Sequence, residues 1–254
     1  MLDFGRINQA VLETEPYRWA FINELFRPAN AEHLAATFPC DKFKKVVGYD
    51  GEKGYEYFSR SLIHMGAGKP SHEEGLSESW RELAYDLLSP AYRQAVSRLT
   101  GRDLSESLLE VNVIHYGPNC WLGPHVDLKE KTVSHILYFN QSWNREDGGY
   151  LEILNSSEPS AVLAETMPLV GNSAVLVRAD NSWHAVARVA EGCRLSRRSL
   201  NVIFHAPGSV SSMWPPGDRP ALADFRMDAW GHPPGPANSG RRSLLSGLLG
   251  GLRR

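Results

Sequence analysis

The amino-acid sequence predicts a mainly β fold with helical support (α+β), in which the strands form a sandwich or a jelly roll. Short runs rich in β-branched and aromatic residues recur between residues 108 and 204, and Gly, Pro, Asn or Asp bounds each of them. No helical pattern separates these runs. Successive strands without intervening helices are typical of sandwiches and jelly rolls.

The first third of the chain is expected to add helices to this sheet. Apolar residues follow helical spacing in residues 29–38, 79–88 and 90–99, so each segment is expected to cover one face of the sheet. Residues 40–77 are rich in Lys, Gly, Ser and His and follow no regular pattern. Because long loops on rigid scaffolds often carry function, we expect here a loop that covers a binding site.

Five strands are expected in the core. Each combines β-branched or aromatic residues with turn-forming residues at its ends. These strands run from Leu108 to Tyr116, His135 to Asn140, Tyr150 to Leu154, Ala174 to Arg178 and Ser199 to Phe204.

The composition changes after Phe204. Seven prolines between Pro207 and Pro236 argue against further strands or helices and predict an extended segment that wraps the domain. Residues 239–254 are basic, with paired leucines. We weigh a short docking or membrane-surface helix against a mobile tail, and four glycines favour the tail.

Overall composition limits the kind of protein. The 254 residues are enough for one domain with a sizeable core, and a net charge of −2 gives no basic field for nucleic acid. Cys40, Cys120 and Cys193 are odd in number and lack metal-site spacing, which fits a reducing compartment. No signal peptide and no apolar run long enough to span a membrane is found. We therefore expect a cytoplasmic protein.

A His-x-Asp motif is the strongest functional signal. His125 and Asp127 are expected to point to the same side of a strand end, and His184 follows 59 residues later. Two imidazoles and one carboxylate can bind one face of a metal ion and leave three octahedral positions open. The motif alone is weak, but Tyr116 and Gly117 lead into it through a polar turn that ends in Pro-His-x-Asp.

Downstream segments strengthen this signal. A strand ends in an Asn-x-x-Trp turn at residues 140–143, a Gly-Gly hairpin follows at residues 148–149, and Ser-Trp-His leads to His184. A basic strand begins at Arg197. In this order, residues 108–206 resemble the Fe(II)/2-oxoglutarate dioxygenases, in particular the prolyl 4-hydroxylases. The resemblance implies a double-stranded β-helix (jelly roll, cupin-like) core.

The resemblance also implies the site residues and cofactors. Fe(II) would be held by His125, Asp127 and His184, with 2-oxoglutarate and O2 as co-substrates; stimulation by ascorbate is left open. Arg197-x-Ser199 matches the family order that anchors 2-oxoglutarate, and Tyr138 matches a tyrosine that binds the same carboxylate. Strand alternation groups Arg197 with Ser199 and Asn201 and sends Arg198 to the other face. Arg194 and Arg198 remain the competing anchors.

Further residues occupy positions that line the cavity in the family. Tyr116, Leu151, Val186 and Asn201 belong to this group, although apolar residues on an inner face are also expected in any core. Trp121, on a turn near the metal, could contact substrate.

The resemblance divides the chain into three parts of one catalytic unit. Residues 1–105 would give helical support and the covering loop, residues 106–206 the catalytic core, and residues 207–254 the proline-rich extension and basic tail. The implied reaction is hydroxylation of a C–H bond, of a prolyl residue or peptide, with decarboxylation of 2-oxoglutarate to succinate. A free amino acid, a natural-product intermediate or a glycan precursor is an alternative substrate. A non-catalytic sensor that binds metal and 2-oxoglutarate is the alternative of another class.

Overall fold

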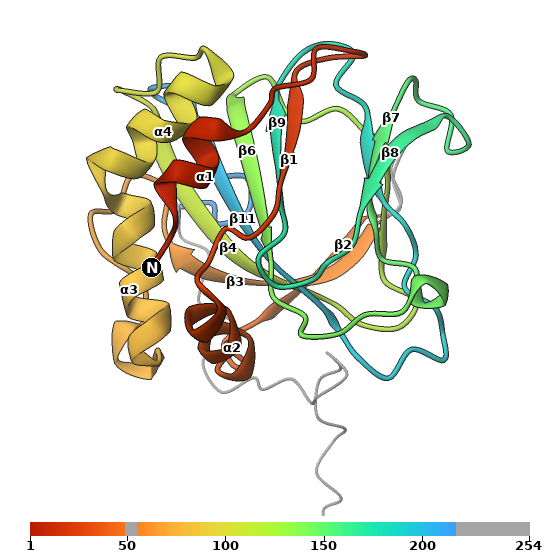
Figure 1. The fold of residues 1–254 in the computed structure, drawn as a ribbon, viewed down its shortest axis with the longest axis horizontal. Coiled ribbons are helices and arrows are strands. Elements are labelled where there is room, and N and C mark those ends of the chain that lie inside the picture. The colour runs from red at the N-terminus through yellow and green to blue at the C-terminus, as the bar shows by residue number, and fades with distance from the viewer. Residues whose placement is uncertain (49–54, 217–254) are drawn as a thin grey trace, which may run out of the picture.

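The computed structural model describes residues 1–48 and 55–216, and its strands form one antiparallel sheet (Figure 1). Within these residues eleven strands pair in the order β1-β9-β6-β11-β4-β3-β5-β10-β7-β8, with β2 added beside β3. The sheet curls into a nearly closed barrel, which confirms the predicted double-stranded β-helix. The strands are β1 (Trp19–Ile22), β2 (Lys44–Gly48), β3 (Tyr55–Ile63), β4 (Leu108–Tyr116), β5 (Trp121–His125), β6 (Lys131–Tyr138), β7 (Leu151–Leu154), β8 (Val162–Thr166), β9 (Ser173–Val177), β10 (His184–Val186) and β11 (Arg197–His205).

The sheet has a larger and a smaller arm. The larger arm runs from β1 to β3 in the sheet order, and the smaller arm from β5 to β8. They join where Tyr55 and Glu56 of β3 pair with Leu122 and Trp121 of β5. Residues from both arms line one cavity, so the arms face each other across it.

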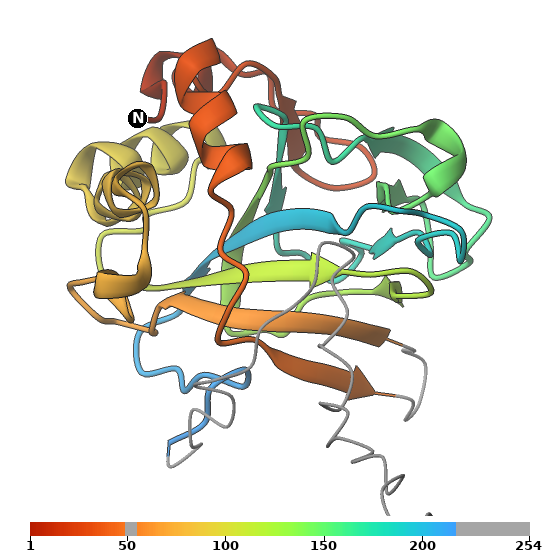
Figure 2. The same cartoon turned by 90° about the horizontal axis from the view of Figure 1, so that it is seen from below.

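Helices cover the outer face of the larger arm (Figure 2). Trp80 of α3 packs against Phe139 with ring centroids 4.8 Å apart, and Tyr92 of α4 stacks on Phe204 at 6.0 Å. The three predicted helices are confirmed, with ends within two residues of those expected. The helical elements are α1 (Phe4–Gln9), α2 (Pro28–Ala36), α3 (Glu78–Leu88), α4 (Pro90–Thr100) and the 3-10 turns η1 (Glu73–Gly75) and η2 (Arg145–Asp147).

Local sequence explains where α3 and α4 begin and end. Ser77 and Ser89 cap their first turns, because each side chain accepts a backbone N–H three residues later. Pro90 occupies the first turn of α4, where its missing N–H costs nothing. Gly101 ends α4 in the left-handed region, with φ of 66°.

Residues 40–77, where a substrate-covering loop was expected to lie, include two strands. β2 and β3 pair within this range, while residues 49–54 between them lie outside the described residues. β3 belongs to the main sheet, where it pairs with β4. The alternating pattern was hidden because β3 is buried on both faces from Phe58 onwards, so that Ser59, Arg60 and Ser61 lie inside.

The segment after the last strand is described only as far as residue 216. Trp214 lies against the core and donates from its indole nitrogen to Asn112 Oδ1 of β4 at 2.7 Å, and the Ser211 hydroxyl donates to Glu110. This part therefore packs on β4. Most of the predicted proline-rich extension and the whole basic tail lie outside the described residues.

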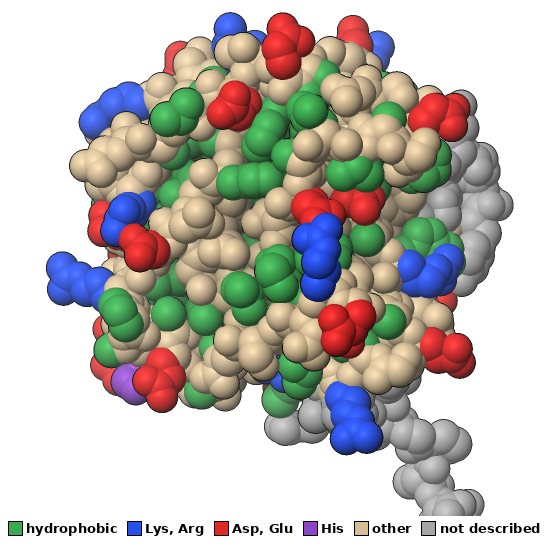
Figure 3. Space-filling model, turned by 45° about the vertical axis from the view of Figure 1, so that its right-hand side comes forward, with side chains coloured by type: hydrophobic (Ala, Val, Ile, Leu, Met, Phe, Trp, Pro, Cys, Tyr) green, Lys and Arg blue, Asp and Glu red, His purple; other side chains and the backbone are tan. Residues whose placement is uncertain are grey.

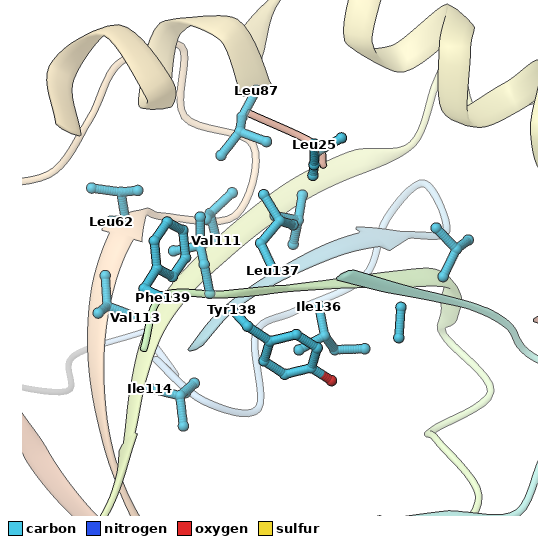
Figure 4. Packing of buried hydrophobic residues seen from close by; sticks show 14 of the residues in the cluster. Leu25, Leu62, Leu87, Val111, Val113, Ile114, Ile136, Leu137, Tyr138 and Phe139 are labelled. Atoms are coloured by element: carbon cyan, nitrogen blue, oxygen red, sulfur yellow. The ribbon is translucent and has the colours of Figure 1, made fainter. Parts of the chain in front are cut away.

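Alternation along the strands divides side chains between the helices and the barrel interior. In β6, Leu137 points toward the helices, whereas Ile136 and Tyr138 point to the opposite side (Figure 4). Ile114 of β4 lies on the side of Tyr138. The hydrophobic core thus fixes which residues of each strand reach the interior.

The surface carries no field of one sign on the face shown in Figure 3, where acidic and basic side chains are interspersed with hydrophobic ones. This arrangement agrees with the net charge of −2. Among the described residues, no helix has the length and apolarity needed to cross a bilayer.

Three histidines of the sheet have structural partners. His115 contacts the Ser196 hydroxyl at 2.8 Å through Nδ1, His135 contacts the Tyr92 hydroxyl at 2.8 Å, and His205 contacts Glu110 at 3.2 Å. Burial lowers the pKa of His115 and of His135 to about 3, and Arg198 adds to the effect at His115. Both imidazoles are therefore neutral in the folded protein.

We predict that the free energy of unfolding falls as the pH drops below about 6.5, because the unfolded state protonates His115 and His135 there and the folded state does not. The loss approaches about 1.4 kcal/mol per pH unit for each histidine. His135→Gln should flatten this dependence in urea denaturation measured at several pH values. The control is His33→Gln at an exposed histidine, which should retain the pH dependence of the wild type. Equal slopes for wild type and His135→Gln would contradict this account.

Candidate metal centre

The three predicted metal ligands meet on the smaller arm. β5 ends at His125 and β10 begins at His184, and antiparallel pairing places the two residues opposite each other. Their ring centroids are 4.2 Å apart. Asp127 follows β5 by two residues, and one ligand atom from each residue lies within 4.8 Å of the others. Within the described part of the chain, these residues form a group able to hold one ion.

Backbone carbonyls select the tautomer of both imidazoles. His125 Nδ1 lies 3.0 Å from the Gly123 oxygen, and His184 Nδ1 lies 2.9 Å from the Ser182 oxygen. A carbonyl oxygen only accepts, so each Nδ1 carries the proton and each Nε2 carries the lone pair. Burial lowers the pKa of His125 well below its usual value, and His184 lowers it further, so the neutral, metal-binding form prevails.

The carboxylate of Asp127 is held by two donors from β6. Lys131 Nζ lies 2.7 Å from Oδ1, and the Ser134 hydroxyl lies 2.8 Å from Oδ2. Burial raises the pKa of Asp127, but attraction to Lys131, His184 and His125 outweighs it and leaves the pKa far below its usual value. Asp127 is therefore ionised and able to serve as an anionic ligand.

The three residues open into a cavity of about 570 Å³. Tyr116, Leu151, Val186 and Asn201 line it, as the sequence interpretation expected. The lining contributed by described residues does not include Trp121, whose ring lies 3.8 Å from the Arg188 guanidinium. The structure thus gives no support for the expected contact between Trp121 and substrate.

Arg197 brings a buried positive charge to the same cavity. The residue is 1% exposed, and its Nε donates to the Gly149 oxygen at 2.7 Å. One terminal nitrogen donates to Ser199 Oγ at 3.0 Å. Gly149, whose carbonyl accepts this bond, has φ of 68°, a conformation that favours glycine, and a Cβ there would lie only 3.1 Å from Trp143 Cζ2. No acidic side chain among the described residues forms an ion pair with Arg197.

Tyr138 lies next to Arg197, with the guanidinium carbon 5.2 Å from its ring centroid. Its hydroxyl is buried and has no hydrogen-bond partner within the described residues. Burial raises the pKa of Tyr138 to about 12 against the opposing effect of Arg197, so the hydroxyl keeps its proton and can donate it. A buried cation without an anion beside a buried hydroxyl without a partner fits a carboxylate. Tyr138 and Ser199 stand beside Arg197 and are not themselves part of the cavity lining.

The competing arginines lie elsewhere. Arg194 is exposed. The Arg198 guanidinium lies 5.6 Å from the ring of Phe38, on the helix side of β11, and Arg198 does not contribute to the cavity lining. Arg197 is therefore the arginine of the three that reaches the cavity.

Sequence reasoning missed several residues of the site. Lys131 and Ser134 hold Asp127, and Tyr55 and Tyr57 line the cavity from β3. Alternation from Tyr138 places Ser134 on the inner face and could have identified it. The tyrosines lie in the range expected to be a loop, so no strand pattern pointed to them.

The donor set fits Fe(II). Two imidazole nitrogens and one carboxylate suit a ferrous ion, and no fourth protein ligand completes the tetrahedron of a structural zinc site within the described chain. The cavity combines open positions on the metal with a cation that can bind a carboxylate. This combination fits a keto acid that binds the metal at one end and the cation at the other.

Comparison with known proteins agrees with this chemistry. Residues 111–205 match the family described as the 2OG-Fe(II) oxygenase superfamily. No curated protein matches the sequence.

Solved structures share the fold. A prolyl-4-hydroxylase from Pseudomonas putida has 18% identity and a TM-score of 0.53, covering 81% of this chain and 99% of that one. A Trichoplax adhaerens prolyl hydroxylase, in complex with a peptide fragment of the hypoxia inducible factor oxygen degradation domain, has 15% identity, a TM-score of 0.52 and coverages of 79% and 87%. A Phytophthora capsici prolyl 4-hydroxylase has 15% identity, a TM-score of 0.54 and coverages of 81% and 66%. At these identities the likeness concerns the fold alone.

We predict that Asp127→Ala abolishes tight binding of Fe(II), because it removes the anionic ligand. The affinity should fall by more than the roughly 10- to 100-fold that loss of a ligand's hydrogen-bond partner costs. Calorimetric titration under anaerobic conditions measures this. Asp180→Ala removes an exposed carboxylate and should bind Fe(II) as the wild type does. Equal affinities of Asp127→Ala and wild type would contradict the assignment.

Proposed function

We propose that this chain, whose residues 111–205 match the family described as the 2OG-Fe(II) oxygenase superfamily, hydroxylates a C–H bond of a prolyl residue or peptide. 2-Oxoglutarate is decarboxylated to succinate in the same reaction. One observation carries the proposal: His125, Asp127 and His184 share a cavity with Arg197, whose buried charge has no acidic partner among the described residues.

Each residue of the triad has a defined part in binding the metal. His125 and His184 offer Nε2, since their Nδ1 protons are held by backbone carbonyls. Asp127 offers one carboxylate oxygen, while Lys131 and Ser134 fix the orientation of the group. When bound, Fe(II) supplies the redox chemistry that couples O2 to oxidation of 2-oxoglutarate and of the substrate.

The 2-oxoglutarate carboxylate remote from the keto group is assigned to Arg197. The guanidinium offers nitrogens in a fixed fork, the Tyr138 hydroxyl supplies a further donor, and Ser199 holds the arginine in place. Because Gly149 and the ring faces of Tyr116 and Tyr138 also hold the guanidinium, the anchor is rigid before the co-substrate arrives.

The lining of the cavity supports a prolyl substrate. Leu151, Val186 and the ring of Tyr116 offer apolar surface for a pyrrolidine ring and exclude water from the reacting C–H bond. The three solved structures compared above are prolyl hydroxylases, which supports the same choice.

We also propose that the three parts of the chain act as one catalytic unit in the cytoplasm. β1 and β3, from the first 105 residues, are strands of the same sheet as the catalytic core. Cys40, Cys120 and Cys193 are free thiols, which agrees with a reducing compartment.

The test is anaerobic loading with Fe(II) and 2-oxoglutarate, followed by O2 and a panel of proline peptides, free amino acids and sugar nucleotides. Formation of succinate together with a gain of one oxygen on a proline peptide is expected. A gain of oxygen on a free amino acid or sugar would move the proposal to that substrate. Binding of metal and 2-oxoglutarate without turnover of any compound would favour a sensor.

We predict that Arg197→Ala weakens 2-oxoglutarate binding by about 2–5 kcal/mol, because a buried carboxylate loses its counter-charge. Arg198→Ala removes the same charge on the helix side of β11 and should leave the affinity nearly unchanged. Calorimetry on the Fe(II)-loaded variants measures both. A larger loss for Arg198→Ala would contradict the assigned anchor.

A further inference from the structure

Lys131 enters the cavity through an irregularity in β6. Along β11, Phe204 pairs with Val133 but His205 pairs with Lys131, so Thr132 is an extra residue. Alternation from Tyr138 through Ile136 and Ser134 would otherwise place Thr132 inside and Lys131 outside. The bulge reverses this, and Lys131 lines the cavity.

Asp127 is the acidic partner of Lys131 within the described residues. Lys131 Nζ lies 2.7 Å from Asp127 Oδ1, and the side chain is 22% exposed. The other cavity lysines are held by different groups. Lys45 pairs with Glu56 at 2.8 Å, and Lys44 donates to the Met213 oxygen and lies 4.1 Å from the Trp214 ring centroid.

When Fe(II) and 2-oxoglutarate are bound, the charge of Lys131 has no matching negative charge in the site. The two charges of Fe(II) and the charge of Arg197 are matched by Asp127 and the two carboxylates of 2-oxoglutarate. Once Asp127 coordinates the metal, its negative charge mainly compensates Fe(II), which carries a higher positive charge than the ammonium group of Lys131. Among the described residues, no second acidic group then compensates the charge of Lys131, which lies in a half-enclosed site next to another cation. This is unfavourable unless an anion binds.

We infer that the substrate carries a carboxylate, which Lys131 binds beside the metal. The inference rests on the proposed function and narrows its substrate class to anionic prolyl compounds. The ammonium group stays within reach of the metal-facing side of the cavity, so this ion pair would orient the C–H bond that is hydroxylated. Lys131 thereby acts as a specificity-determining residue.

Two chemical groups could supply this carboxylate to Lys131. It is either the terminal carboxylate of proline or the side chain of an acidic residue next to proline in a peptide. Two matched pairs of probes separate them. N-acetyl-L-proline and N-acetyl-L-prolinamide differ in the terminal carboxylate, and N-acetyl-Pro-Asp-amide and N-acetyl-Pro-Asn-amide differ in the side-chain carboxylate.

The experiment measures probe binding to the full chain by calorimetry, without O2, at saturating Fe(II) and 2-oxoglutarate. Absence of O2 prevents turnover, and saturation keeps Arg197 occupied so that the probe does not compete for it. In one of the two pairs, the acidic probe should bind at least about 10-fold more tightly than its neutral partner, equivalent to about 1.4 kcal/mol. That pair identifies the source of the carboxylate.

Variants test whether Lys131 causes the preference for the acidic probe. Lys131→Gln and Lys131→Met should bring the ratio of the two Kd values close to one, and Lys131→Arg should retain it. The matched control is Lys129→Gln, which removes a charge from an exposed position two residues away and should leave the ratio unchanged. The affinity of each variant for Fe(II) is measured first, because Lys131 also contacts Asp127.

Several outcomes overturn the inference. One such outcome is a wild type that binds Fe(II) and 2-oxoglutarate but fails to prefer the acidic probe in either pair, or that binds no probe. Either result overturns this inference and not the proposed metal and 2-oxoglutarate site. Undiminished preference in a folded Lys131→Gln or Lys131→Met variant does the same. Failure of the wild type to bind Fe(II) and 2-oxoglutarate overturns the proposed function and this inference together.

Discussion

The pairing of β5 with β10 is the constraint on which the site depends. It places His125 and His184 opposite each other, with ring centroids 4.2 Å apart, and brings Asp127 alongside. β10 is held on its other edge by β7, where His184 pairs with Ile153. Short strands of this kind are stable only within a larger sheet, so the metal ligands converge only when the smaller arm has folded onto the larger one.

A buried positive charge is the second constraint, and it belongs to the larger arm. Transfer of an isolated guanidinium from water into the interior costs several kcal/mol. Arg197 recovers part of this through the Gly149 oxygen, Ser199 Oγ and two aromatic faces, all of which are neutral. The charge itself is compensated only by an anion. The fold therefore keeps a rigid, unfavourable charge in a place where binding of an acid relieves it.

Local patterns explain why some elements were predicted closely and others were not. β4 and β11 were expected within two residues of their observed ends, because buried β-branched runs bounded by turn residues carry a clear signal. β3 carries Ser59, Arg60 and Ser61 in its buried part, so neither alternation nor an apolar run marked it. β10 has three residues and owes its existence to its neighbours, so its own sequence carries too little signal.

The sequence by itself determined the fold class and the identity of the three candidate ligands, because a His-x-Asp pair and the motifs around it are local in the chain. It also determined that Arg197 and Arg198 lie on opposite faces, since alternation follows from the pleat. Only the tertiary structure decided which neighbours those residues meet. Trp121 lies against Arg188 and outside the part of the cavity lining that described residues form, and a bulge against β11 turns Lys131 into the cavity. These outcomes depend on contacts between distant segments, which no local pattern encodes.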